Sequence, residues 1–346
     1  MNSIINPIMR YGNRKIVNGL LRIAGVNAPN CLCCKPGSQS FADTTINGGT
    51  LAIDGTLATG SITMADATTL AVDGTVQAAG GTQTAIAGSA GANTVTVGSG
   101  GSLLASGDLG DGADVVTLAG LLDTGSGTLG LGAGADRVTL RDGAAIDGTG
   151  IDAGADTNDQ LILDNASDLD FNGTATSGFE TLVKQNAGTA SMSGTQSFSA
   201  GTALDGGTLA IDGTLQTPTL TMADGTTLDV GGTLEAVGGT QADIGGSAGT
   251  NTVTVAAGGT LHATGDLADG NDTLDVAGTL DTGSGTFSLG AGDDAFVIHD
   301  GTQVLGTVDG GAGLDPGIYD IDLTADICAL TGFEGLTKPG TSTLNI

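Results

Sequence analysis

Residues 49–57 read GTLAIDGTL, and residues 207–215 repeat the same nine residues, 158 positions later. The match continues without a gap from residue 49 to about residue 149, and about 60% of these positions are identical to residues 207–307. Long internal repeats are typical of solenoids and related architectures. We therefore divide the chain into a basic leader or N-terminal cap (1–37), a first repeat unit (38–195) and a second, truncated repeat unit (196–346). We expect the two units to form one continuous solenoid.

Within each unit, short aliphatic and β-branched runs such as TLAI, TVTV and RVTL recur about every 19 to 27 residues. Each run is followed by Gly or Asp-Gly, and β-branched runs bounded by such turn residues predict strands. The period predicts an all-β fold, a right-handed parallel β-helix (β-solenoid) of about 15 coils. A pair of β-sandwiches is the alternative, and it would place antiparallel strands side by side.

The leader has a different pattern. Between Asn13 and Val26, apolar residues recur at helix-compatible spacing, with Arg14, Lys15 and Arg22 on the opposite side. This predicts a short N-terminal amphipathic helix that covers the first coil as a cap, because solenoid ends need covering. An export signal is the alternative, since the segment is basic and lies at the amino terminus.

The charge of the chain excludes some partners. The 346 residues include 38 Asp and Glu but only 9 Lys and Arg, for a formal net charge of −29. Such a surface repels nucleic acid, so we expect no nucleic-acid partner. No run of 18 apolar residues occurs, and we expect no membrane insertion by this chain itself.

Two related segments, GFETLVK at residues 178–184 and GFEGLTK at residues 332–338, each close a repeat unit. The first leads into Gly- and Thr-rich strands, and the pattern resembles the passenger domain of bacterial type V autotransporters. That resemblance implies a parallel β-helix at the bacterial outer-membrane surface or outside the cell, most often as an adhesin. It also implies that this chain is a passenger or a fragment of one, since no membrane barrel follows residue 346.

Turns of the type Gly-x-Gly-x-Asp occur once per expected coil and are the strongest local chemical signal. They resemble the calcium-binding nonapeptide of repeats-in-toxin proteins, whose Asp and backbone oxygens suit Ca²⁺. The candidate metal ligands are Asp114, Asp136, Asp156, Asp272, Asp294 and Asp315. The alternative is that these turns are solvated corners in which each Asp caps its own backbone. Ca²⁺ is the one candidate cofactor.

We expect no catalytic residues. The two His, His262 and His299, have Leu104 and Arg141 as counterparts in the first unit, so neither belongs to a duplicated site. Arg137 and Arg141 form the one basic cluster of the repeat units, and a surface ion-pair patch explains them.

The sequence therefore predicts a non-catalytic, adhesin-like surface or secreted protein. Its partner would be a host cell, an extracellular-matrix component or another copy of itself. A calcium-binding secreted repeat protein and a polysaccharide-active β-helix enzyme that uses Arg137 are the alternatives.

Overall fold

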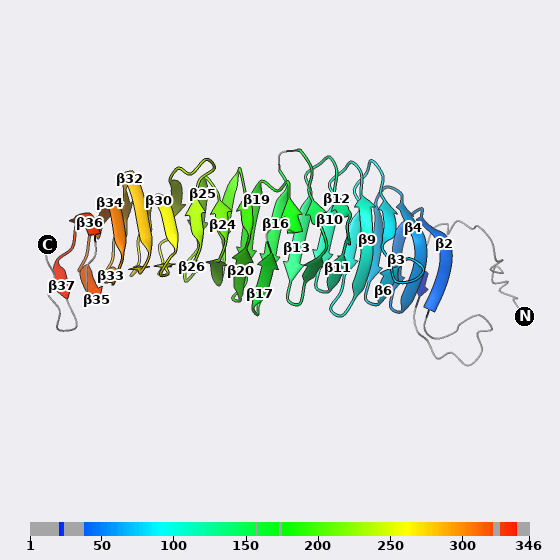
Figure 1. Cartoon of the computed structure of the whole chain (residues 1–346), viewed down its shortest axis with the longest axis horizontal. Helices are drawn as coiled ribbons and strands as arrows, with labels where there is room; N and C mark the ends of the chain where they lie inside the picture. Colours follow the sequence, from blue (N-terminus) through cyan, green and yellow to red (C-terminus); the bar gives the residue numbers. More distant parts are fainter. Residues whose placement is uncertain (1–20, 24–37, 157, 173–174, 321–325, 338–346) are drawn as a thin grey trace, which may run out of the picture.

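The computed structural model describes residues 21–23, 38–156, 158–172, 175–320 and 326–337, and all its regular elements in these ranges are β-strands apart from a single 3₁₀ residue. The strands stack side by side along one long rod (Figure 1). The 18-stranded sheet contains β1 (Leu21–Ile23), β3 (Gly49–Ile53), β5 (Thr68–Val72), β8 (Thr94–Val97), β10 (Val115–Leu118), β13 (Arg137–Arg141), β16 (Gln160–Asp164), β19 (Thr181–Gln185), β21 (Thr195–Ser197), β22 (Gly201–Leu204), β24 (Thr214–Gln216), β25 (Thr219–Met222), β27 (Thr233–Glu235), β28 (Ala242–Gly245), β30 (Thr260–Asp266), β32 (Thr279–Ser288), β34 (Gln303–Asp309) and β36 (Asp326–Thr331).

Two further sheets complete the wall of the rod. The 10-stranded sheet contains β2 (Ser38–Ile46), β4 (Thr56–Met64), β6 (Thr75–Gln77), β7 (Thr84–Ala87), β9 (Ser102–Asp108), β11 (Leu121–Asp123), β12 (Thr128–Gly130), β14 (Ala145–Asp147), β15 (Gly150–Asp152) and β18 (Thr176–Ser177). The 9-stranded sheet contains β17 (Leu169–Asn172), β20 (Thr189–Ser193), β23 (Thr208–Ile211), β26 (Thr227–Val230), β29 (Thr252–Val255), β31 (Thr273–Val276), β33 (Ala295–His299), β35 (Pro316–Asp320) and β37 (Gly335–Thr337).

The register confirms a parallel β-solenoid. Leu51 pairs with Leu70, Leu70 with Val95, and Val95 with Val116, always in parallel strands. The same ladder runs on to Leu330 and makes about 13 turns, fewer than the predicted 15 because most coils exceed 20 residues. The sandwich alternative is wrong, since all pairings between the described strands are parallel.

The core is a set of aliphatic columns. Leu70, Val95, Val116 and Val138 are each fully or almost fully buried and stack directly upon one another. Outward residues alternate with these inward ones along many strands, as in β5, where buried and half-buried residues alternate. Burying each such side chain contributes about 1.5–3 kcal/mol. Aliphatic residues fill most of the interior, together with a few Phe such as Phe198, Phe287 and Phe296, and the sequence contains no Trp.

The two repeat units are rotated about the rod axis relative to one another. The TLAI strand of the first unit, β3, belongs to the 18-stranded sheet, whereas its counterpart β23 belongs to the 9-stranded sheet. The 18-stranded sheet continues through the junction because β19 of the first unit pairs with β22 of the second. β22 is not the counterpart of a first-unit strand in this sheet but of a strand on another face of the coil. Each coil contributes three strand segments, for example β26, β27 and β28. Since 158 residues span seven coils and roughly one third of another, the pattern advances by one face.

The amino-terminal prediction is wrong where the structure describes it. Residues 21–23 are strand β1 rather than part of a helix, and Leu21 pairs with Leu51 of β3. The edge of β3 offers unpaired backbone groups, which a strand satisfies and a helix does not. The rest of the expected helix, within residues 13–26, lies outside the described residues. In the described part of the chain, no helix has the length and hydropathy needed to cross a bilayer.

Candidate functional site: two buried aspartate ladders

Two columns of acidic side chains run along the rod, each at the corner where the chain enters a strand. The first ladder consists of Asn93, Asp114, Asp136, Asp159 and Glu180, which directly precede β8, β10, β13, β16 and β19. The second ladder consists of Asn251, Asp272, Asp294, Asp315 and Glu334, which directly precede β29, β31, β33, β35 and β37. Because the repeat units are rotated, the first ladder borders the 18-stranded sheet and the second borders the 9-stranded sheet.

Each carboxylate in the first ladder holds the backbone of the preceding coil. The backbone N–H of Asn93 donates to Oδ1 of Asp114 at 2.6 Å, and that of Asp114 donates to Oδ1 of Asp136 at 2.7 Å. The backbone N–H of Asp136 donates in turn to Oδ1 of Asp159 at 2.7 Å, and the backbone N–H of Asp159 donates to Oε2 of Glu180 at 2.9 Å. An Asp here therefore caps its neighbour's backbone rather than its own, contrary to the solvated-corner alternative.

The second ladder repeats this geometry. The backbone N–H of Asn251 donates to Asp272 at 2.6 Å, that of Asp272 to Asp294 at 2.7 Å, and that of Asp294 to Asp315 at 2.9 Å. Glu334 accepts from the N–H of Asp315 at 3.0 Å and ends the column. Duplication of the sequence has therefore duplicated a complete five-residue device on another face of the rod.

Five of the six predicted Asp residues lie in these ladders, and Asp156 does not. The side chain of Asp156 is exposed and accepts a hydrogen bond from the backbone N–H of Gly134 at 2.7 Å. Asp159 takes the ladder position instead, because it immediately precedes β16. The Gly-Ala-Asp match drew attention to the wrong residue, whereas adjacency to the strand start would have identified Asp159, and likewise Glu180 and Glu334.

One oxygen of each ladder Asp is buried without a donor. The six Asp side chains are at most 1% exposed. None of the described residues donates a hydrogen bond to their Oδ2 atoms, which belong to Asp114, Asp136, Asp159, Asp272, Asp294 and Asp315. A buried carboxylate oxygen without a partner is costly, so it is the natural place for a proton or a cation.

Burial shifts the titration of the ladder. Loss of solvent raises the pKa of Asp114 to about 7, against the lowering effect of the N–H of Asn93, and the charge of Asp136 raises it further. Burial likewise raises the pKa values of Asp136 and Asp272 to about 6. The pKa values of Asp159, Asp294 and Asp315 are also raised, chiefly by burial. At neutral pH Asp114 is therefore close to its titration point, and burial disfavours the charged form of all six ladder Asp residues.

The glycines of the turns have a packing role. Gly134 and Gly292 have φ values of 153° and 154°, in a region that favours glycine. A Cβ on Gly134 would lie 1.7 Å from the carbonyl oxygen of Gly112, and one on Gly292 would lie 1.4 Å from that of Gly270. The Gly-x-Gly pattern is thus required for the coils to stack, whether or not a metal binds.

The ladders offer a cation oxygen donors of the right kind. Ca²⁺ takes six to eight oxygens from carboxylates and backbone carbonyls. The part of the chain that the structure describes contains no group of three or more His, Cys, Asp or Glu side chains placed to hold one ion. A bound Ca²⁺ would therefore use orphaned Asp oxygens from successive coils together with turn carbonyls. The oxygen donors of the ladders fit Ca²⁺, and turn carbonyls would have to supply most of its six to eight ligands.

The neutral residue at the head of each ladder, Asn93 or Asn251, has hydrogen-bond partners for its side-chain amide. The side-chain amide of Asn93 donates to the carbonyl oxygen of Ala65 at 2.7 Å and to the hydroxyl of Thr68 at 3.2 Å. Asn251 makes the same two bonds to Ala223 and Thr226, at 2.7 and 3.3 Å. An amide can therefore occupy this column and leave no unpaired oxygen.

The other predicted polar residues lie in separate places. Arg141 forms an ion pair with Asp164 of the next coil at 3.1 Å, while Arg137 is exposed on the same strand. His299 contacts Asp275 at 2.7 Å, and His262 lies 3.8 Å from Asp281. Each of these three contacts joins neighbouring coils on the outer surface.

Threonines form outward columns on two faces of the second half of the rod. One column places a Thr in the same register position of five successive coils: Thr189, Thr208, Thr227, Thr252 and Thr273. Another does so with Thr195, Thr214, Thr233, Thr260 and Thr279. These columns present one chemical group at the coil spacing of about 4.8 Å.

Comparisons with known proteins add little to these observations. No protein-family model matches the chain, and no curated protein matches it significantly. Among solved structures, an X-ray crystal structure of a hyperactive, Ca²⁺-dependent, β-helical antifreeze protein from an Antarctic bacterium is similar. It is 20% identical, over 89% of this chain and 79% of that chain, with a TM-score of 0.28.

Proposed function

We propose that this protein is a non-catalytic, adhesin-like rod that works outside a bacterial cell or on its outer surface. Its partner would be a host-cell or extracellular-matrix component, or another copy of itself. The observation that carries the proposal is the pair of threonine columns, in which five successive coils present the same residue. A regular array on a stiff support favours binding to a partner that is itself repetitive.

Avidity gives such a surface its strength. A single threonine contact with a partner contributes little, because an exposed hydroxyl exchanges one hydrogen bond with water for another. Contacts repeated on a rigid rod form at high effective concentration once the first is made. The parallel ladder holds the spacing without flexible linkers, so little ordering entropy is lost on binding.

The test is binding of the full chain to collagen- or fibronectin-coated surfaces and to epithelial cells. Introducing Glu at Thr208, Thr227 and Thr252 together interrupts the first threonine column, and we expect binding to fall steeply. A matched control introduces Glu at Ala85, Ser106 and Thr128, which lie outside the core on three successively paired strands of the 10-stranded sheet, β7, β9 and β12. Equal loss in both variants, or none in either, would contradict the proposal.

A second candidate function, a calcium-binding secreted repeat protein, is favoured by the six orphaned Asp oxygens. Calorimetric titration with Ca²⁺ should show saturable binding, and chelation should lower the melting temperature. Unchanged melting after chelation would exclude it. The polysaccharide-active alternative predicts depolymerising activity that is lost in Arg137→Ala.

A further inference from the structure

The coil-to-coil pairing is interrupted between β14 and β17, and we call this interruption the breach. Strands on either side of these two segments pair normally from coil to coil: β13 pairs with β16, and β15 with β18. Among the described strands, however, β14 pairs with β11 alone and β17 with β20 alone. Two neighbouring segments on one face therefore each leave an edge without a ladder.

A difference in segment length accounts for the breach. Nine residues lie between Arg141 and Ile151, whereas eleven lie between their register partners Asp164 and Thr176. The longer segment carries β17 toward β20, so that β17 is the first strand of the 9-stranded sheet. The breach therefore lies near the end of the first repeat unit, where the 10-stranded sheet ends and the 9-stranded sheet begins.

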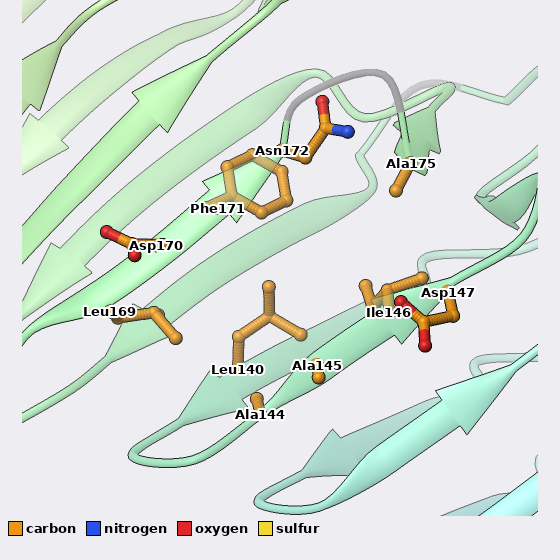
Figure 2. A pocket seen from close by; sticks show the side chains of 10 residues that line it. All are labelled: Leu140, Ala144, Ala145, Ile146, Asp147, Leu169, Asp170, Phe171, Asn172 and Ala175. Atoms are coloured by element: carbon orange, nitrogen blue, oxygen red, sulfur yellow. The ribbon is translucent and has the colours of Figure 1, made fainter.

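The breach contains a cavity of about 220 Å³ with an apolar floor. Figure 2 shows the side chains of Leu140, Leu169 and Phe171 gathered between the two strands, with Ile146 beside them. Ile146 is only partly buried, although Leu122, on which it stacks, is fully buried. In the second unit its counterpart Val304 is fully buried and pairs with Ile327. Val304 of the second unit is therefore covered by the next coil, whereas Ile146 of the first unit is not.

The open edge of β14 can be located to one residue. The N–H of Ala145 donates to the carbonyl oxygen of Gly120, and the carbonyl oxygen of Asp147 accepts from the N–H of Thr124. Residues alternate direction along a parallel strand, so Ile146 directs its N–H and C=O away from β11 and toward the breach. On the rim, the exposed carboxylates of Asp147 and Asp170 make the entrance negative.

We propose that this breach binds an extended polypeptide segment in which apolar residues alternate with Lys or Arg. The segment adds as a strand to the edge of β14 and pairs with the backbone of Ile146. An apolar side chain fills the cavity over Leu169 and Phe171, and the flanking cations meet Asp147 and Asp170. The site is distinct from the threonine columns, because its lining residues, 140–175, include no residue of either column.

The probe is a fluorescent heptapeptide, Lys-Val-Lys-Ile-Lys-Val-Lys, titrated into the full chain and followed by anisotropy. We expect saturable, one-to-one binding. Ala144→Leu, which fills the cavity, should weaken binding about tenfold, which corresponds to the loss of about 1.4 kcal/mol. Methylating the backbone nitrogens on one edge of the peptide should weaken binding similarly, since it removes the pairing hydrogen bonds without changing charge.

A second variant protects the test against misfolding. The double substitution Asp147→Asn and Asp170→Asn leaves the core untouched and should weaken binding, whereas Asp243→Asn, an exposed site on β28, should not. Equal affinity in all of these proteins would overturn the proposal, because it would indicate attraction to the acidic surface in general. Absence of binding, or full affinity of the methylated peptide, would overturn it as well.

Discussion

The backbone N–H of Asp114 donates to Oδ1 of Asp136, 22 residues later in the chain, at 2.7 Å. This bond joins two stacked, neighbouring coils, and the same bond recurs along both ladders. The hydrogen bonds of the ladders therefore stabilise the stacking of the coils. The same positions bury carboxylates away from water, and this burial disfavours their charged form.

We expect the free energy of unfolding, measured in chelator, to fall as the pH rises from 5 to 8. The folded-state pKa of Asp114 is about 7 and those of Asp136 and Asp272 are about 6, all above the ordinary value of 3.8. Between these values the folded chain binds more protons than the unfolded chain. The stabilisation is thus complete below about pH 4 and is lost as the pH passes 6 to 7. Urea melts at each pH measure it, and a rising or flat profile would contradict it.

Asp136→Asn should stabilise the chain at pH 8 in chelator and flatten its pH profile. The amide oxygen can still accept from the N–H of Asp114, and no buried negative charge remains. Asn93 and Asn251 show that an amide fits this column. The control Asp243→Asn removes an equal charge from the surface and should change the melting temperature little. A clear loss of stability in Asp136→Asn would exclude this account.

If Ca²⁺ occupies the ladders, millimolar Ca²⁺ should abolish the decline in stability above pH 6. A cation bound only by the charged form cancels the cost of ionising Asp114 and Asp136. The Ca²⁺-dependent rise in melting temperature should shrink in Asp136→Asn. Mg²⁺ at equal concentration is the control for simple charge screening, and an equal effect of both cations would count against a specific site.

Gly292→Ala should lower the free energy of unfolding by about 3 kcal/mol or more. The Ala would adopt a strained backbone conformation, and its methyl group would clash with the neighbouring coil. Its Cβ would lie 1.4 Å from the carbonyl oxygen of Gly270. The matched control is Gly245→Ala, where no atom lies within 4 Å of the new Cβ and φ is outside the glycine-favouring region. Thermal melts of the two variants compare the effects directly, and similar melting temperatures would refute the packing role.

Lys184→Met should lower the free energy of unfolding by about 1–3 kcal/mol, since hydrogen bonds to a charged group are lost and three partly buried acceptors lose their donor. Lys184 is fully buried and stacks in register between Leu163 and Leu204. Its ammonium donates to the carbonyl oxygens of Gln185, Asn186 and Gly206 at 2.7, 2.9 and 3.1 Å. Met keeps the apolar stem but satisfies none of these oxygens. Chemical denaturation measures the loss, and a more stable variant would show that burial of the charge dominates.

Much of this architecture could be predicted because the local pattern repeats. The alternation in TLAI and TVTV, with Gly and Asp after each run, indicates strand and turn in every coil, and the repeated units indicate stacking. Five of the ladder Asp residues were also found in this way. Asp156 was wrongly chosen over Asp159 because the motif specifies a turn, whereas the strand that follows determines which side chain points along the rod.

The sequence by itself determined a parallel β-solenoid built from two copies of one unit, because inward aliphatic residues and turn glycines recur with every coil. Only the tertiary structure decided that the copies differ by one face, that Asp oxygens are buried without donors, and that β14 and β17 do not pair with each other. The physical reason is that these properties depend on the length of a whole coil relative to the next. A difference of two residues between neighbouring segments leaves every local pattern intact while it shifts which strands meet.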